Sequence, residues 1–227
     1  EDPAMLAIFN YIEAVARSPQ PILIYGETGT GKELIADAIH ACADGTGALV
    51  PVTAAGLDDT LFSDTLFGHE RGAYTTADRA RDGLVAKAAN GTLFLDEIGD
   101  LTAESQIKLL RLLQNRTYYP IGSDRETHSS ARIVVATNRD LEGRVSDGLF
   151  RSDLYYRLRT HTIRLPPLRS RRSDVAPLAR HFLEQASVAL HKAPLTISST
   201  ALQWLQQHDF PGNIRELEAM IYDAAAV

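Results

Sequence analysis

The segment GETGTGKE at residues 26–33 has the composition and glycine spacing of a phosphate-binding loop. The apolar run PILIY at 21–25 comes directly before it, and a helical pattern follows. In that context the backbone N–H groups of the loop can converge on an anion at the N-terminus of the helix. We therefore predict a nucleotide-binding loop over residues 26–33. The glycines that allow its tight turn are Gly26, Gly29 and Gly31.

Lys32 is placed to reach the β- and γ-phosphates of a bound nucleotide. Glu33 stands where a Ser or Thr usually contacts Mg²⁺, so the usual hydroxyl is missing. The alternative, a glycine-rich turn that binds nothing, does not explain why strand, spacing and lysine occur together. The remaining loop residues that we expect to line the nucleotide, together with Glu33, are Glu27, Thr28 and Thr30.

Two carboxylates end the apolar run in GTLFLDEIGD at residues 91–100. The carboxyl ends of parallel strands form the edge at which α/β proteins bind ligands. At that edge Asp96 would hold Mg²⁺ through water, and Glu97 would orient or deprotonate an attacking water molecule. An Asp-Glu pair in a solvated turn is the alternative, and the accompanying phosphate loop argues against it.

Polar residues in two further segments could complete a nucleotide site. In RIVVATNRD at 132–140, Asn138 could place water against the γ-phosphate, although a turn-forming asparagine is the simpler explanation of this segment alone. In FRSDLYYRLR at 150–159, Arg151 and Arg157 either form weak surface ion pairs or reach a neighbouring subunit's site as arginine fingers.

The segment FPGNIREL at 210–217 predicts the start of a helix, because Pro-Gly-Asn precedes a helical run. Arg215 falls in the first turn, where the helix dipole disfavours a cation. An anionic partner such as the nucleotide would explain this position, and so would an ion pair with a carboxylate.

These residues need a scaffold, and the apolar pattern supplies an α/β one. The predicted strands, buried on both faces, are 21–25, 48–52, 92–96, 132–137 and 161–165. The predicted helices are 4–17, 32–42, 103–115, 174–191, 198–208 and 213–225. Alternation of strand and helix predicts a parallel sheet covered on both faces over residues 1–167, followed by a small all-helical domain over 168–227.

Composition excludes several classes of function. The chain has 227 residues and a net charge of −6, so electrostatics alone does not make it a nucleic-acid-binding protein. Cys42 is the only cysteine, which excludes a disulfide framework. No apolar run is long enough to span a membrane. The basic cluster of Arg169, Arg171 and Arg172 at the domain junction is interpreted as a solvated hinge.

Taken together and in order, the motifs resemble the central ATPase domain of bacterial sigma-54-dependent transcriptional activators, a branch of the AAA+ superfamily. The matching stretches span essentially the whole chain: GETGTGKE, LFGHERGAYTTA, GTLFLDEIGD, ATNRDL, FRSDLYYRL, LPPLRSRRSD and FPGNIREL. The resemblance implies a P-loop NTPase fold with a five-stranded parallel sheet, a helical lid, and ATP with Mg²⁺ bound between them. It also implies cytoplasmic rings, usually hexamers, that hydrolyse ATP to remodel sigma-54 RNA polymerase.

Residue roles follow from the resemblance position by position. Lys32 matches the phosphate contact, Asp96 the Mg²⁺ residue and Glu97 the residue that activates water. Asn138 matches the first sensor, Arg215 the sensor arginine of the lid, and Arg151 and Arg157 the intersubunit arginines. In the family, DNA recognition and signal sensing belong to further domains, which we expect to lie outside this chain.

The resemblance also assigns a role to GAYTTA at residues 72–77, where the family usually has Gly-Ala-Phe-Thr-Gly-Ala. That loop grips the sigma factor when ATP is bound and withdraws after hydrolysis. The partner-binding residues implied are Gly72, Ala73, Tyr74, Thr75, Thr76 and Ala77.

This chain departs from the family pattern at two places. Thr76 replaces a glycine, and a β-branched residue stiffens a loop that must rearrange. Thr53-Ala54 replaces the usual Asn-Cys, whose Asn restrains the catalytic glutamate. Two alternatives therefore stand beside the sigma-54 activator: an AAA+ regulator that hydrolyses ATP without engaging sigma-54, and a nucleotide-gated oligomerisation module.

Overall fold

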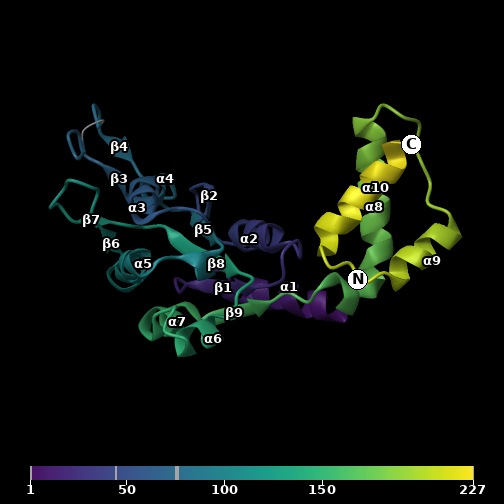
Figure 1. Cartoon of the computed structure of the whole chain (residues 1–227), viewed down its shortest axis with the longest axis horizontal. Coiled ribbons are helices and arrows are strands. Elements are labelled where there is room, and N and C mark those ends of the chain that lie inside the picture. The colour runs from purple at the N-terminus through teal and green to yellow at the C-terminus, as the bar shows by residue number, and fades with distance from the viewer. Residues whose placement is uncertain (1, 44, 75–76, 227) are drawn as a thin grey trace. The chain divides into compact units, whose positions relative to one another are not determined.

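The computed structural model describes residues 2–43, 45–74 and 77–226 (Figure 1). By contacts between residues, the chain divides into two compact units. We call residues 12–25 and 34–163 the sheet unit, and residues 1–11, 26–33 and 164–227 the lid unit. The phosphate loop predicted at 26–33 thus groups with the C-terminal helices.

The sheet unit is built on a five-stranded parallel sheet of order β2-β5-β8-β1-β9. The strands are β1 (Ile22–Tyr25), β2 (Leu49–Thr53), β5 (Thr92–Asp96), β8 (Arg132–Thr137) and β9 (His161–Arg164). In register, Thr53 on β2 lies opposite Asp96 on β5. Tyr25 on β1 lies opposite Thr137 on β8. The ends of β2, β5, β8 and β1 therefore lie along one edge of the sheet.

Apolar side chains on successive positions hold this sheet in the core. From Leu93 to Leu95 on β5 and from Ile133 to Ala136 on β8, every residue is buried. Because neighbouring side chains on a strand point to opposite faces, such runs require cover on both sides. This confirms the predicted class, a parallel sheet between helices.

Helices and short strands complete the first part of the chain. The helices are α1 (Pro3–Val15), α2 (Lys32–Ala41), α3 (Asp59–Phe67), α4 (Leu84–Lys87), η1 (Ile98–Asp100), α5 (Ala103–Asn115), α6 (Leu141–Ser146) and α7 (Ser152–Leu158). Two small antiparallel pairs join β3 (Gly68–His69) to β4 (Arg81–Asp82) and β6 (Thr117–Tyr118) to β7 (Thr127–His128).

The C-terminal part of the chain is helical. It contains η2 (Leu168–Ser170), η3 (Arg172–Asp174), α8 (Val175–Ala189), α9 (Ser199–Gln207) and α10 (Asn213–Ala226). Helices α8 and α10, green and yellow in Figure 1, lie side by side. They share a core with Phe210, which is fully buried. The predicted helical segment is thus confirmed, and the boundary at residue 167 stays a prediction because residues 26–33 and 164–167 group with the lid unit.

Within the described parts of the chain, no helix has the length and apolar character needed to cross a membrane.

Candidate functional site

Residues 26–31 form a loop between β1 and α2, and residues 32 and 33 open that helix. Gly29 and Gly31 adopt φ of 78° and 97°, a region that side chains other than glycine rarely enter. A Cβ built on Gly29 would lie 2.3 Å from the carbonyl oxygen of Gly212. Position 29 therefore requires glycine for two reasons. Its φ is unfavourable for other residues, and the Gly212 carbonyl leaves no space for a Cβ atom.

Lys32 begins α2, and its ammonium group turns back toward the loop. The residue is 7% exposed. Its Nζ donates to the carbonyl oxygens of Gly26 and Glu27, at 3.3 and 3.5 Å. The hydroxyl of Thr30 donates to the Glu27 carbonyl at 2.7 Å. These contacts fold the loop around the lysine.

The start of α10 is bonded directly to the phosphate loop. The backbone N–H of Ile214 donates to the carbonyl of Gly29 at 2.9 Å. The Glu216 carboxylate accepts from the Gly212 N–H at 2.7 Å, which caps the start of the helix. Arg215 lies in the first turn, and its Cβ would be 3.2 Å from a Cβ on Gly29. The lid arginine predicted from the sequence is therefore beside the loop.

The Glu27 carboxylate is hydrogen-bonded to two residues of the C-terminal helical segment, residues 168–227, which we call the lid. Arg169 donates from Nη1 to Oε2 at 2.8 Å and from Nη2 to Oε1 at 2.5 Å. Asn213 donates from Nδ2 to Oε2 at 3.1 Å. The hydrogen bond from Arg169, followed by that from Asn213, lowers the pKa of Glu27 from 4.5 to about 2. Glu27 is therefore an anion inside a loop predicted to bind anions.

Asn213 is a buried connector between three segments of the lid unit. It is fully buried and has φ of 55°. Its Oδ1 accepts from the Leu168 N–H at 2.8 Å, and its Nδ2 also donates to the Thr28 carbonyl at 3.1 Å. The two other loop residues, Thr28 and Glu33, are exposed, and Glu33 lies in the first turn of α2.

In the sheet unit, the predicted catalytic residues follow adjacent strands. Asp96 is the last residue of β5, Glu97 comes next, and Asn138 comes directly after β8. The N–H of Glu97 donates to Asp96 Oδ1 at 2.8 Å. Glu97 has φ of 58°, an uncommon conformation for a non-glycine residue, and such conformations cluster at functional sites.

The donor set at this edge fits Mg²⁺ in its usual protein setting. That ion keeps several waters and takes one or two carboxylates plus substrate phosphates. Asp96 is a half-buried carboxylate at the strand end, which suits this role. Among the residues that the structure describes, no group of three or more His, Cys, Asp or Glu could hold a metal.

The arginines of the 150–159 segment are bonded within their own chain. Arg151 pairs with Asp153 at the start of α7, with Nη2 to Oδ2 at 2.7 Å, which raises the pKa of Arg151. Arg157 is half-buried and donates from Nη2 to the Leu113 carbonyl at 3.2 Å. Their predicted role at a subunit interface stays a prediction.

The predicted partner loop leaves β3 and returns to β4. Gly72 has φ of 82°, and its N–H donates to the Ala77 carbonyl at 2.8 Å. Ala73 precedes Tyr74, whose hydroxyl lies 3.2 Å from His69 Nδ1. The partner-binding predictions for Thr75 and Thr76 lie outside the described residues.

His69 organises the base of this loop, and our sequence analysis gave it no role. Its Nδ1 lies 2.5 Å from Asp64 Oδ1, and its Nε2 lies 3.0 Å from the Arg79 carbonyl. Arg81 pairs with the other Asp64 oxygen at 2.8 Å. Residues 64, 69, 79 and 81 thus join the two arms of the hairpin. The sequence pattern around a histidine next to a helix end does not indicate which residues it will be hydrogen-bonded to.

Comparisons with known proteins agree with this arrangement. The family model described as the sigma-54 interaction domain matches residues 1–164, and a model described as the AAA+ ATPase lid domain matches residues 169–227. The chain belongs to the sigma-54 interaction domain family. The fold is accordingly the AAA+ P-loop NTPase fold with a C-terminal helical lid, in a family of ATPase type.

Members of the sigma-54 interaction domain family resemble the chain over its full length. Transcriptional regulatory protein ZraR of Klebsiella oxytoca is 46% identical over 228 residues, covering 100% of this chain and 52% of ZraR. The sigma54-dependent transcriptional activator SfnR of Pseudomonas putida is 45% identical, covering 98% of this chain and 61% of SfnR. The chain therefore spans about half the length of the first of these relatives.

A solved structure shows the same architecture. NtrX from Brucella abortus, crystallised in complex with ATP, superposes with a TM-score of 0.91 at 33% identity. The match covers 99% of this chain and 49% of that NtrX chain.

Proposed function

We propose that this chain binds ATP and hydrolyses it to ADP and phosphate, and that hydrolysis drives activation of transcription by sigma-54 RNA polymerase. The observation that carries the proposal is the loop at 26–33. It turns through Gly29 and Gly31 into α2 and holds Lys32 against its own carbonyls. The crystal structure of NtrX in complex with ATP, which has a similar fold, supports the same ligand.

In this proposal the phosphate loop binds the β- and γ-phosphates through its N–H groups and Lys32. Arg215 contributes positive charge from the lid. Asp96 would hold Mg²⁺, which neutralises charge on the phosphates when it is bound. The nucleotide-binding residues are those of 26–33, through their backbone N–H groups and the Lys32 side chain, with Asp96 and Arg215, and residues 1–167 and 168–227 act as core and lid.

Hydrolysis needs a water molecule that is oriented and deprotonated. Glu97 accepts a proton from the water as its oxygen bonds to the γ-phosphorus, and the bond to the β-phosphate oxygen breaks to release ADP. Asn138 helps to position that water. Arg157 and Arg151 of an adjacent subunit stabilise the charge of the transition state.

The proposal includes assembly and a partner. Subunits form a ring, taken as a hexamer, so that each site is completed by its neighbour. The loop at 72–77 contacts the sigma-54 holoenzyme, and promoter DNA is recognised by a domain outside this chain. The membership of the chain in the sigma-54 interaction domain family supports this partner.

A pair of experiments tests the chemistry and the partner separately. Glu97→Gln should keep ATP binding and lower the hydrolysis rate by roughly a hundredfold or more, since it removes the general base. Unchanged phosphate release would overturn the role of Glu97. Open-complex formation with sigma-54 holoenzyme, measured for the unchanged chain and for Thr76→Gly, tests the partner; failure of both would overturn it.

A further inference from the structure

Three neighbouring arginines follow Leu168, and their side chains go to three different places. Arg172 is exposed and pairs with Asp209, between α9 and α10, at 3.0 Å. Arg171 is 4% exposed and donates from Nη2 to the Thr30 carbonyl at 2.8 Å. Arg169 pairs with Glu27. The prediction of a solvated position is therefore wrong for Arg171, which is buried, whereas Arg169 is exposed and bonded to the phosphate loop.

The contact between Arg169 and Glu27 is more specific than an ordinary surface ion pair. The two terminal guanidinium nitrogens each donate to a different carboxylate oxygen, the paired geometry that gives arginine its directional strength. Asn213 supplies a third donor, and its own position is fixed because it is fully buried and bonded to Leu168. The hydrogen bond and charge of Glu27 also raise the pKa of Arg169. We call Glu27, Arg169 and Asn213 the clamp.

A carboxylate in a phosphate-binding loop creates an electrostatic problem. A nucleotide phosphate brought to that loop would be repelled by Glu27, and solvent reduces such repulsion without removing it when the charges are only a few ångströms apart. A guanidinium that forms two hydrogen bonds to the carboxylate cancels its charge at short range. Glu27 is also half-exposed, so a hydrogen bond to its carboxylate is not needed for folding alone.

We propose that Arg169 and Asn213 are positioning residues that hold and neutralise Glu27, so that the loop accepts an anionic nucleotide only while the lid is docked on it. This inference rests on the nucleotide binding proposed above. It assigns Glu27 a role different from the one predicted from sequence: the side chain anchors the lid, and the nucleotide is bound by other groups of the loop. Loop and lid are thereby coupled through charge.

Calorimetric titration of ADP into the 227-residue chain tests the clamp with four variants. Arg169→Gln leaves the Glu27 charge uncompensated and should weaken ADP binding on the order of tenfold. Glu27→Gln should change the affinity by less than about threefold. The double variant should bind like Glu27→Gln, because removing the carboxylate removes the repulsion. Arg172→Gln is the matched control and should bind like the unchanged chain.

Conditions and a conservative variant separate a charge effect from simple misfolding. The penalty of Arg169→Gln should shrink as salt is raised, since mobile ions screen the exposed carboxylate. Arg169→Lys keeps the charge and loses the paired geometry, so it should recover part of the affinity. Thermal unfolding of each variant confirms that the lid unit is folded.

Each other result has a definite meaning. Equal weakening by Arg169→Gln and by the double variant would show that Arg169 binds the nucleotide directly and would overturn the clamp. Equal weakening by both single variants would show that the clamp acts as a mechanical contact and not through charge. No weakening by Arg169→Gln would show that the clamp has no role in ADP binding. Absence of ADP binding by the unchanged chain would instead overturn the proposed function, and this role of the clamp with it.

Discussion

At the residue scale, Glu27 carries a pH dependence with a definite sign. Arg169 and Asn213 lower its pKa from 4.5 to about 2, so folding favours the ionised carboxylate. The resulting stabilisation is fully present above about pH 4.5 and is lost as the pH falls toward 2. Since the side chain is 44% exposed, solvent screening limits it to about 1 kcal/mol or less.

Acid unfolding of the unchanged chain and of Glu27→Gln measures this contribution. The free energies of unfolding should differ by a constant amount above pH 4.5 and converge as the pH approaches 2. Arg172→Gln, which removes the exposed pair with Asp209, is the control and should run parallel to the unchanged chain. A gap between the curves of the unchanged chain and Glu27→Gln that widens in acid would contradict the assignment.

At the scale of elements, Gly29 decides how closely the start of α10 approaches the phosphate loop. Gly29→Ala places a Cβ 2.3 Å from the Gly212 carbonyl oxygen, at a φ of 78°. We expect a loss of roughly 1–3 kcal/mol of stability from the backbone conformation alone, and ADP affinity reduced by more than tenfold because loop and lid are forced apart.

The chain provides a matched control for this variant. Gly56 has φ of 77°, and a Cβ built on it meets nothing within 4 Å. Gly56→Ala therefore carries the conformational cost without the collision, and its ADP affinity should not change. If calorimetry gave the two variants the same affinity, close approach of Gly212 would not be what the site needs.

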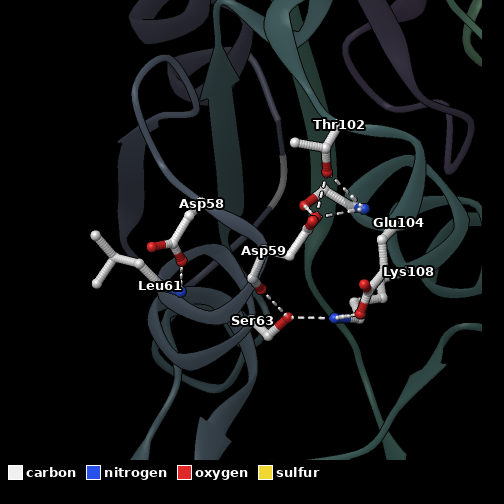
Figure 2. A network of polar contacts seen from close by, with 8 residues as sticks. Asp58, Asp59, Leu61, Ser63, Thr102, Glu104 and Lys108 are labelled. Carbon is white, nitrogen blue, oxygen red and sulfur yellow. Dashed lines mark hydrogen bonds and ion pairs between the residues drawn. The ribbon is translucent and has the colours of Figure 1, made fainter.

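A polar network joins the starts of α3 and α5 (Figure 2). Asp59 accepts hydrogen bonds from the hydroxyl of Thr102 and from the N–H and hydroxyl of Ser105. Lys108 then connects Ser63 to Glu104, with both distances 2.7 Å. Because α5 follows the Asp96-Glu97 segment and α3 leads into β3, this network links the strand edge that ends at Asp96 to the helix that enters the loop at 72–77.

Removal of Asp59 should loosen this junction. Asp59→Ala takes away the acceptor of three donors, so we expect a melting temperature lower by a few degrees and faster amide exchange in α3. Glu104→Gln removes only the exposed ion pair with Lys108 and should change neither quantity. Unaltered exchange in α3 after Asp59→Ala would mean that the helix is held by its apolar contacts alone.

Much of this arrangement could be predicted from the sequence. Five apolar runs predicted the five strands of the parallel sheet to within a residue or two, since continuous burial leaves a clear pattern. The predicted helix at 103–115 is confirmed at both ends. The start at Asn213 followed from Pro-Gly-Asn.

Other features depend on contacts between distant segments, which a linear pattern does not contain. Helix α3 has few apolar residues at helical spacing beyond Phe62, Leu66 and Phe67, and was not predicted. The binding of Arg169 and Arg171 to the phosphate loop joins residues separated by more than 140 positions. Charge clusters are usually solvated, so the sequence alone did not indicate that Arg171 is buried.

At the scale of the whole molecule, the proposed ring requires each hydrolysis site to contain residues from two subunits. Glu97 would act on the nucleotide of its own subunit, whereas Arg157 would act on that of its neighbour. Within its own chain Arg157 is bonded to the Leu113 carbonyl and Arg151 to Asp153. These contacts hold the side chains of both arginines on or next to α7.

Mixing two inactive variants tests whether sites are shared. Glu97→Gln subunits retain Arg157, and Arg157→Ala subunits retain Glu97, so a ring of both contains some interfaces with both groups intact. Each variant alone should release phosphate at no more than about a hundredth of the normal rate. The equimolar mixture should recover a substantial fraction. A mixture no more active than its components would place Arg157 outside the neighbouring site, since a self-contained site could not be completed by another subunit.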